Sequence, residues 1–474
     1  MEHYIRGAMN LFHKQKYHKQ NVRQDTVAND LCIGCGVCAA ICPDECIEML
    51  FTETKEWHPY IDEDSCSECG QCIACCPHSS RNLHDDIEEI TTSEYPEYYG
   101  IIGHECRIAH ERIDANRKRS ASGGAVTAIL MDLITNGHID AVIHMKRNWD
   151  YIGGIHFQSD ISYSAQEIDG KRSSAYYPLC LADVLLHIKR SDRPLRYACV
   201  GVPCFINAIV RAFDYPPFNR NHLLTVALMC SHNVTGQFTD FIAQSNKIPH
   251  NRKFRVNFRD KEDIPTAYDY TNAFEFDDSV IRFDRFRTAY TTAWRRHFFA
   301  YTACFFCPDF YGVRADVSVK DAWSAPWGLN SLGTSMLVVR NRELLSLVHN
   351  MAGLSCENIP SHTVFDDQRI SPLIKQKEIT SRLHMNNTFA AKISGRALRH
   401  NITNGTYLHY CMAKLSKALY RRRGFTGVYL LYRVCASGEK LKQMILNNIY
   451  RALSMIKVIL ICLGLQKLKT RGLQ

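Results

Sequence analysis

The stretch that decides the fold is CIGCGVCAAICP at residues 32–43, and the chain repeats it as CSECGQCIACCP at residues 66–77. Each copy reads Cys-x2-Cys-x2-Cys-x3-Cys-Pro, which is the ligand spacing of proteins that hold two 4Fe-4S clusters. Three thiolates on one tight loop can bind three irons of a single cubane. Zinc or disulfides are the alternative, but zinc sites use pairs of cysteines rather than triplets at this pitch.

The fourth cysteine of such a run ligates the cluster of the other run. We therefore expect one 4Fe-4S cluster on Cys32, Cys35, Cys38 and Cys76, and the second on Cys66, Cys69, Cys72 and Cys42. This arrangement is typical of bacterial ferredoxins. The sequence thus predicts a lead-in at residues 1–25 and a ferredoxin-type domain with two clusters at residues 26–85.

The bulk composition is that of a globular protein in a reducing compartment. The chain has 474 residues, of which 46% are apolar, and this is enough for about three domains with ordinary cores. Its 21 cysteines are an odd number, and cluster thiolates need reducing conditions. We expect neither a signal peptide nor a transmembrane helix, because no apolar run is long enough. The expected location is the cytoplasm.

The charge is distributed unevenly along the chain. Residues 381–474 hold 17 Lys and Arg and a single acidic residue, a net charge of about +16. Since the whole chain carries +9, the remainder carries −7. Helically spaced apolar residues accompany the Arg421–Arg423 run, so we expect a basic helical tail that binds an anionic membrane surface, peripherally at its inner face. The alternatives are a helical extension packed on the body, or docking to an acidic partner. No nucleic acid is expected, because no recognition motif accompanies the charge.

The central region alternates strand-like and helix-like runs. We expect strands near residues 139–145, 195–200, 223–229, 254–258, 315–319 and 334–339, a hairpin at 274–283, and helices at 125–135 and 343–351. The acidic segment 85–99 is expected to be a linker. The predicted fold class is α+β: a bacterial-ferredoxin-like module, an α/β core with a mixed sheet, and a C-terminal helical basic tail.

Four further cysteines have suggestive positions. Cys204 and Cys230 each follow a predicted strand, where ligands gather in open α/β sheets, and Cys304 and Cys307 form a Cys-x-x-Cys pair. They could converge on a third 4Fe-4S cluster. Spacing alone leaves zinc, or inert buried cysteines, as alternatives. Cys46, Cys75 and Cys106 lack ligand spacing, and we interpret them as structural.

Six motifs occur in an order found in one known family. They are SASGG at 120–124, GVPC at 201–204, LMC at 228–230, FRDK at 258–261, CFFCP at 304–308 and ADVSVKDAW at 315–323. In this set the chain resembles the beta-subunit family of coenzyme F420 hydrogenase and dehydrogenase over roughly residues 26–375. The resemblance implies the family's N-terminal domain at 95–175 and its C-terminal domain at 176–375, with the basic tail at 381–474.

The resemblance also implies an FAD and a 4Fe-4S cluster in the core domain. It implies Cys204, Cys230, Cys304 and Cys307 as ligands of that cluster. Two positions depart from the family pattern: Phe205 stands where Gln is common, and Lys320 where Gly is common. These departures leave open whether the deazaflavin coenzyme is used, and the roles of both residues.

Candidate flavin residues are Ser122, Gly123, Gly124, Arg259, Lys261 and Asp321. Glycines at a helix start let backbone amides approach a phosphate, although a serine–glycine cap needs no ligand. The two cations could neutralise phosphates or a reduced flavin, or belong to a solvated turn. Asp321 and Trp323 could line the pocket, or be a capping aspartate and a core tryptophan.

These observations favour an oxidoreductase. In this reading electrons come from a soluble ferredoxin or another carrier, pass through the 4Fe-4S clusters to FAD, and reach an organic acceptor. Two alternatives remain open. One is a non-catalytic electron-transfer subunit of a larger dehydrogenase or hydrogenase complex, and the other is a redox sensor that keeps clusters but lacks flavin.

Overall fold

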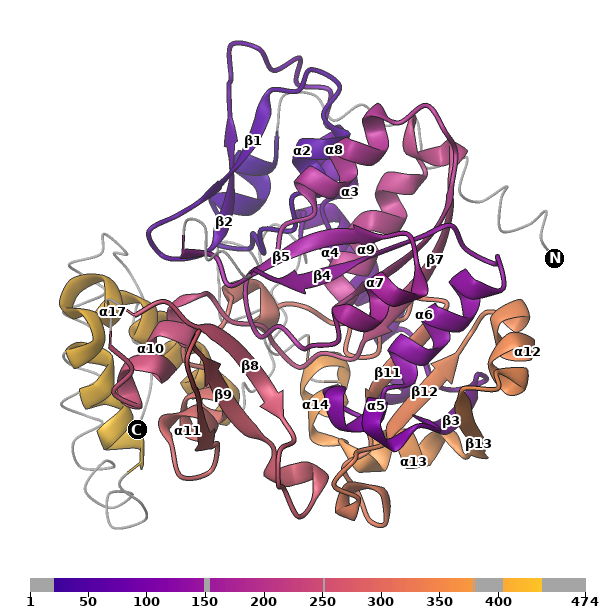
Figure 1. The fold of residues 1–474 in the computed structure, drawn as a ribbon. Coiled ribbons are helices and arrows are strands. Elements are labelled where there is room, and N and C mark those ends of the chain that lie inside the picture. Colours follow the sequence, from indigo (N-terminus) through magenta and orange to yellow (C-terminus); the bar gives the residue numbers. More distant parts are fainter. Residues whose placement is uncertain (1–20, 149–153, 250–251, 378, 380–403, 437–474) are drawn as a thin grey trace.

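The body of the protein is an eight-stranded mixed sheet of order β13-β3-β12-β11-β7-β6-β4-β5 (Figure 1). The computed structural model describes residues 21–148, 154–249, 252–377, 379 and 404–436. The strands are β3 (Glu105–Glu111), β4 (Ala141–Arg147), β5 (Phe157–Ser162), β6 (Arg196–Gly201), β7 (His222–Leu228), β11 (Val317–Asp321), β12 (Ser335–Val339) and β13 (Leu354–Ile359). The four central strands β4, β6, β7 and β11 are parallel, and the flanking pairs are antiparallel. The predicted mixed sheet is confirmed.

Helices cover both faces of this sheet, because its central strands are apolar on both sides. On β4, Ala141 and Ile143 belong to one core cluster, while Val142 between them belongs to the other. The Val142 face packs against α6 (Ala125–Thr135), α7 (Ala165–Gly170) and α12 (Arg342–Asn350). The opposite face packs against α8 (Ala182–Arg190) and α9 (Pro203–Phe213).

The ferredoxin-type module lies on the second face, beside α8 and α9 (Figure 1). It contains the π-helical turn η1 (Arg23–Val27), the short helices α2 (Val37–Ile41) and α3 (Gln71–Cys75), and the hairpin β1 (Ile47–Phe51) with β2 (Trp57–Ile61). Each cysteine run enters its helix through a glycine with positive φ, Gly36 at 79° and Gly70 at 74°. Val37 and Ile41 of α2 share one core cluster with Leu185 of α8, so the module and the sheet form one body.

The first part of the acidic segment 85–99 is helical, which corrects the expected linker for residues 85–91. Residues 80–91 form α4 (Ser80–Thr91), which Ser79 caps by accepting a hydrogen bond from the Asn82 amide. Its apolar face buries Leu83, Ile87 and Ile90, which is the helical spacing that the acidic composition obscured. On the same helix the buried Asp86 pairs with two arginines of the core.

A second, smaller sheet stands beside the main one. It consists of β8 (Arg255–Asp260), β9 (Thr271–Glu275) and β10 (Val280–Asp284), all antiparallel. With α10 (Gln237–Ser245) and α11 (Ala289–Arg295) it encloses an aromatic core that includes Phe238, Phe258, Phe274 and Tyr290. The predicted strand at 254–258 and the hairpin are thereby found, each displaced by a few residues.

The remaining short elements connect these layers. They are α5 (Asp114–Arg119), α13 (Ser361–Asp367), α14 (Ile370–Pro372), the 3-10 turns η2 (Pro96–Tyr98), η4 (Phe218–Arg220), η5 (Ala267–Asp269), η6 (Thr302–Phe305) and η7 (Trp327–Leu329), and the π-helical turn η8 (Leu373–Lys377).

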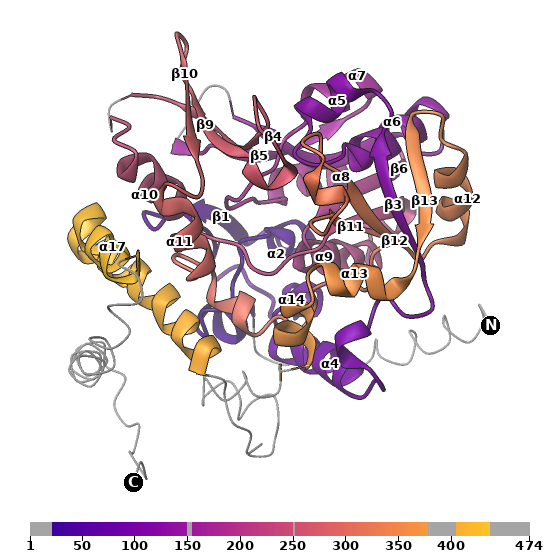
Figure 2. The same ribbon diagram turned by 90° about the horizontal axis from the view of Figure 1, so that it is seen from below.

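The C-terminal helix is α17 (Asn404–Ala436), which is kinked at Gly424. Figure 2 shows it alongside α10 and α11. Met412 and Val428 are buried in the aromatic core, and the Ser416 hydroxyl accepts a hydrogen bond from the Phe299 amide at 2.8 Å. The helical tail is confirmed for these residues, whose apolar face packs on the body. The predicted membrane contact stays a prediction, and residues 381–403 and 437–474 of the predicted tail lie outside the described part.

The arginine run of α17 is exposed. No helix among the described residues combines the length and the apolar character needed to span a bilayer.

Asp86 anchors the module side of the molecule to the core, and its removal should be costly. It accepts hydrogen bonds from Arg211 at 3.0 Å and Arg314 at 2.8 Å. Because Asp86→Ala leaves two guanidinium groups without this carboxylate, we expect the free energy of unfolding to fall by about 3 kcal/mol. Glu88→Ala, on the exposed face of α4, is the control and should change it by less than about 0.5 kcal/mol. Equal effects of the two variants in chemical denaturation would contradict the anchoring role.

Candidate electron-transfer site

The first cysteine run lies together with one cysteine of the second run. Burial raises the pKa of Cys32, and the neighbouring Cys35 and Cys76 thiols raise it further. Burial likewise raises the pKa of Cys38, with contributions from Cys35, Cys32, Cys76 and Cys72. Such mutual effects require proximity, so the structure brings together the four cysteines expected around one cluster.

The second set lies at the outer side of the module. Burial raises the pKa of Cys72 to about 12, with a contribution from Cys69, which is itself exposed. Burial raises the pKa of Cys46 to about 12 as well, with contributions from Cys42 and Cys66. Cys42 of the first run therefore lies with the second run, which is the crossed arrangement expected from the sequence.

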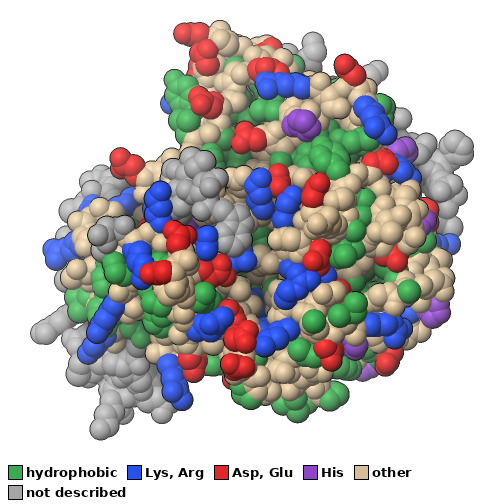
Figure 3. All heavy atoms as spheres, in the orientation of Figure 1, with side chains coloured by type: hydrophobic (Ala, Val, Ile, Leu, Met, Phe, Trp, Pro, Cys, Tyr) green, Lys and Arg blue, Asp and Glu red, His purple; other side chains and the backbone are tan. Residues whose placement is uncertain are grey.

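Cys46 is closer to this set than its lack of ligand spacing indicated. Its sulfur lies 3.4 Å from that of Cys42, and an Asp44 carboxylate oxygen is within 4.8 Å of both. Acidic side chains gather on the module in the space-filling view (Figure 3). Glu63, Asp64 and Glu68, which precede Cys69, are exposed, so the surface beside this set is negatively charged.

The four core cysteines line one cavity. Strands β6 and β7 run parallel in register, with Val200 opposite Val226, so both chains leave the sheet at the same edge. Cys204 follows β6 in the first turn of α9, and Cys230 follows β7. Cys304 in η6 and Cys307 just after it complete the lining.

Thiol chemistry at this cavity fits a metal centre. Burial raises the pKa of Cys204, and Cys307, Cys230 and Cys304 add to the effect. Four buried thiols that oppose one another's ionisation can all become thiolates when a cation is bound among them. The Cys304 sulfur also accepts a hydrogen bond from the Asn233 amide at 3.3 Å, as cluster sulfurs commonly do.

The module reaches into the same cavity. Ile33 and His78, one from each cysteine run, line it together with Tyr301 and Phe205 of the core. Burial raises the pKa of Tyr301, and both Cys32 of the module and Cys304 of the core contribute. Tyr301 thus lies between the first cysteine set and the core set. Neither Tyr301 nor His78 could be identified from the sequence, because the only signal at either residue is a cysteine nearby in the chain.

The side chain of Lys261 forms hydrogen bonds within the protein. Its ammonium group donates to three backbone carbonyls, those of Arg117 at 2.5 Å, Ser122 at 2.8 Å and Leu332 at 2.7 Å. Burial, together with the charge of Arg259, lowers the pKa of Lys261 to about 7. Since all three protons of the ammonium are engaged, Lys261 braces the loop that carries Ser122 and is not available to a phosphate.

The two glycines of the SASGG motif also serve packing. A side chain at Gly123 would come within 2.9 Å of the Thr334 backbone. Gly124 has φ +80°, and a side chain there would come within 2.7 Å of the Glu111 carboxylate. The Ser122 hydroxyl donates to the Thr334 carbonyl at 3.1 Å. The motif is therefore fitted closely to its own neighbours.

Arg259 and Asp321 form the part of the predicted flavin group that faces aromatic rings. The Arg259 guanidinium donates to the Asp321 carboxylate at 2.6 Å. It lies 4.7 Å from the ring centre of Tyr270 and 5.1 Å from that of Trp323. Although burial opposes the charge, Asp321 raises the pKa of Arg259, and the Nε atom of Arg259 is buried without a hydrogen bond in the described chain. Rings, a cation and an unused donor together fit a planar anionic cofactor.

The two departures from the family pattern have structural explanations. Lys320 pairs with the buried Asp367, which also accepts hydrogen bonds from the Trp323 and Ser324 amides. Lys320 therefore fixes the turn after β11. Phe205 is buried and supplies an apolar wall of the cysteine cavity.

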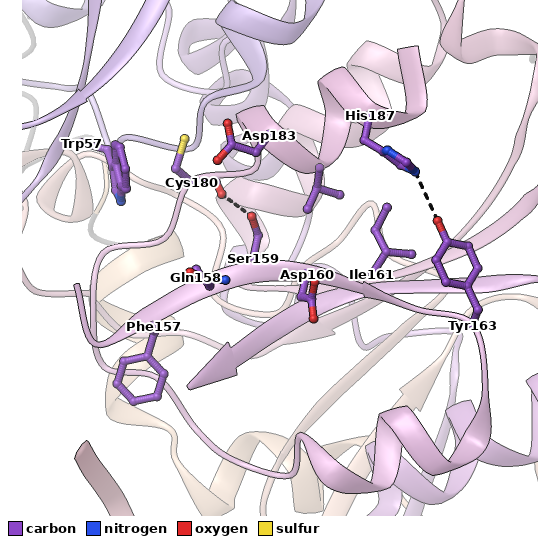
Figure 4. A pocket seen from close by; sticks show the side chains of 11 residues that line it. Trp57, Phe157, Gln158, Ser159, Asp160, Ile161, Tyr163, Cys180, Asp183 and His187 are labelled. Carbon is purple, nitrogen blue, oxygen red and sulfur yellow. Dashed lines mark hydrogen bonds between the residues drawn. The ribbon is translucent and has the colours of Figure 1, made fainter. Parts of the chain in front are cut away.

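A second, open cavity of about 360 Å³ lies between the module and the edge strand β5 (Figure 4). Trp57 of β2, Ser159 of β5 and His187 of α8 line it, together with Cys180. Its inner wall touches the first cysteine loop, since a side chain at Gly36 would come within 2.4 Å of the Cys180 sulfur. The thiol is not a nucleophile here, because burial holds the pKa of Cys180 far above its usual value.

This fold and this arrangement of cysteines define an iron–sulfur electron-transfer protein. The model of the 4Fe-4S dicluster domain matches residues 31–80. The models of the coenzyme F420 hydrogenase/dehydrogenase beta subunit match residues 108–186, for its N-terminal part, and 195–362, for its C-terminal part. The chain belongs to this beta-subunit family of oxidoreductases and carries a 4Fe-4S dicluster domain in front of it.

Two similar proteins illustrate the relationship. An uncharacterised protein of Methanocaldococcus jannaschii is 26% identical over 236 residues, which cover 44% of this chain and 62% of the relative. The chain thus spans about three-fifths of that relative's length. A chain of the F420-reducing [NiFe] hydrogenase complex from Methanosarcina barkeri is 17% identical, with coverage of 64% of this chain and 97% of that one, and a TM-score of 0.47.

The contacts at Gly124 predict a large effect of the smallest substitution. Gly124→Ala adds backbone strain at positive φ and displaces Glu111, whose carboxylate binds the buried Arg172 at 2.6 and 3.0 Å. We expect the free energy of unfolding to fall by about 3 kcal/mol or more, with or without added FAD.

Gly137→Ala is the matched control, because Gly137 also has positive φ but has open space around it. Its cost should be about 1–2 kcal/mol, from backbone strain alone. If chemical denaturation gives the same loss for both variants, the close packing around Gly124 contributes nothing.

Proposed function

We propose that this protein is an iron–sulfur flavoprotein oxidoreductase that takes electrons from a soluble ferredoxin or a similar carrier and reduces an organic acceptor. The observation that carries the proposal is the single cavity lined by Cys204, Cys230, Cys304 and Cys307, with Ile33 and His78 of the dicluster module in the same lining. When bound, 4Fe-4S clusters would carry single electrons and FAD would exchange them for the electron pair that an organic acceptor takes.

The proposed ligands are three sets of four cysteines. They are Cys32, Cys35, Cys38 and Cys76; Cys42, Cys66, Cys69 and Cys72; and Cys204, Cys230, Cys304 and Cys307. Of these twelve cysteines only Cys69, in the second set, is exposed. A carrier in solution can therefore approach the set that contains Cys69.

Of the six flavin residues expected from the sequence, we propose that only two contact the flavin. Arg259 and Asp321, with the rings of Tyr270 and Trp323, are proposed to contact the flavin. Ser122, Gly123, Gly124 and Lys261 are proposed to hold the loops around it, because their polar groups and space are used within the chain. Lys261 then acts by positioning Ser122 and not by binding a phosphate.

A second function deserves a test because so many of the expected flavin residues are engaged internally. In that case the chain would transfer electrons within a larger assembly and would not turn over an acceptor itself. Purified protein, reduced by dithionite-reduced ferredoxin and supplied with FAD and an artificial two-electron acceptor, separates the two. Catalytic turnover supports the oxidoreductase, and reduction of the clusters without turnover supports the transfer subunit.

Iron content tests the third cluster. Anaerobically purified protein should hold about twelve irons, four for each cluster. The double variant Cys304→Ala/Cys307→Ala should hold about eight, because half of the inner ligand set is gone, and Cys356→Ala, on β13, should keep about twelve. About eight irons in the wild-type protein, unchanged in the double variant, would refute the inner cluster.

Flavin affinity tests the role of Arg259. Arg259→Gln removes a charged donor from the aromatic site, so the dissociation constant of FAD should rise about tenfold or more while the iron content stays constant. Arg282→Gln is the control, since Arg282 is a partly exposed arginine on β10 that pairs with Asp260. A wild-type dissociation constant for Arg259→Gln in a fluorescence titration would show that the flavin lies elsewhere.

A further inference from the structure

A buried lysine lies against the inner cysteine set. Lys375 is in η8, beyond the residues that match the family models, and only 4% of it is exposed. Its ammonium group donates to the Cys307 sulfur at 3.5 Å, the Cys230 carbonyl at 3.0 Å and the Asp309 carbonyl at 3.2 Å. Two of these three contacts are with residues proposed as ligands of the inner cluster.

Burying an ammonium group is expensive unless negative charge lies nearby. The Asp309 carboxylate is one source, but it accepts hydrogen bonds from the amides of Gly312 and Val313. Four thiolates on an iron–sulfur centre supply the larger negative charge, and Lys375 contacts one of their sulfurs. The position of Lys375 is therefore explained by the centre that the cysteines hold.

The first cysteine set has a different electrostatic environment. Among the described residues, Cys32 accepts from the Gly34 amide at 3.4 Å, and Cys76 contacts the Thr26 hydroxyl at 3.4 Å. Both partners are neutral, whereas the inner set contacts a cation. Charge-assisted hydrogen bonds are roughly twice as strong as neutral ones, and net charge and hydrogen bonds to sulfur set the potential of such clusters.

We propose that Lys375 is a positioning and tuning residue that raises the reduction potential of the inner 4Fe-4S cluster above that of the first cluster. Reduction adds one electron, and so one negative charge, to a centre that the ammonium group faces. The cation stabilises the reduced state more than the oxidised state. Electrons that enter through the module would then be held preferentially at the inner cysteine set. This inference rests on the proposed inner cluster.

The test is an anaerobic redox titration of the protein, followed by electron paramagnetic resonance. Lys375→Gln keeps a donor but removes the charge, and it should still hold about twelve irons. Its inner cluster should be at least tenfold harder to reduce at a given potential, which for one electron corresponds to a decrease of about 59 mV. Lys375→Arg keeps the charge and should shift the equilibrium by less than about threefold. Lys377→Met, at an exposed lysine of the same turn that pairs with Glu97, should change nothing.

An unchanged inner potential in Lys375→Gln would overturn the proposal, and so would an equal decrease in Lys377→Met. If Lys375→Gln loses its inner cluster, the potentials of the inner and first clusters are compared in the wild-type protein. The paramagnetic resonance signal that is absent from Cys304→Ala/Cys307→Ala is assigned to the inner cluster. The proposal requires that this cluster have a higher reduction potential than the first cluster. A lower potential would refute the tuning role. Only about eight irons in the wild-type protein would instead refute the proposed function on which this inference rests.

Discussion

The parallel register of β6 and β7 is the constraint on which the inner site depends. Because Gly201 lies opposite Ala227, both strands end at the same edge of the sheet, and the next few residues of each chain must turn away there. Cys204 begins a helix at that point and Cys230 begins a loop. A bridge between Val234 and Ala300 then brings the η6 segment, with Cys304 and Cys307, back to the same edge. Three separate segments of sequence thus present four thiols to one cavity.

Two glycines of the first cysteine loop allow close packing around the module. Gly34 packs on the backbone of Trp57, and Gly36 packs on Cys180 and Ala182 at the start of α8. A side chain at Gly36 would force the first cysteine loop away from α8, whereas a side chain at Gly34 would clash with β2 of the module itself. Since electron transfer weakens steeply as the path lengthens, this loop has to remain close to the inner cavity. Gly34 and Gly36 both allow the tight turn through their positive φ, and Gly36 also allows close approach to the neighbouring domain.

The sequence predicted most reliably what is encoded locally. The cysteine runs have a fixed spacing, the central strands are continuous apolar segments, and α6 begins and ends where its glycine and apolar pattern indicate. The edge strands β5 and β13 were not predicted, because FQSDIS and LSCENI are mostly polar and gain their partners only from the sheet. Helix α4 was not predicted because its sequence is acidic. Its buried carboxylate, that of Asp86, is stabilised by Arg211 and Arg314, which come from distant parts of the chain. Lys375 could not be found either, since nothing in the PLIKQK segment indicates a buried ammonium group.

Lys261 and Lys375 show why residue type alone did not identify the functional cation. Both are buried lysines, and both donate to backbone carbonyls. The ammonium group of Lys261 donates all its protons to backbone carbonyls, so it stabilises a loop. Burial and the nearby charge of Arg259 lower the pKa of Lys261, so its charged form is disfavoured. Lys375 directs one donor to the sulfur of Cys307, where negative charge would change with redox state when the proposed inner cluster is bound. A buried cation shifts a reduction potential only where the negative charge beside it changes on reduction. The sequence motif that contains Lys261 marks a structural brace, while Lys375, the cation proposed to face the inner cluster, lies in a segment without a motif.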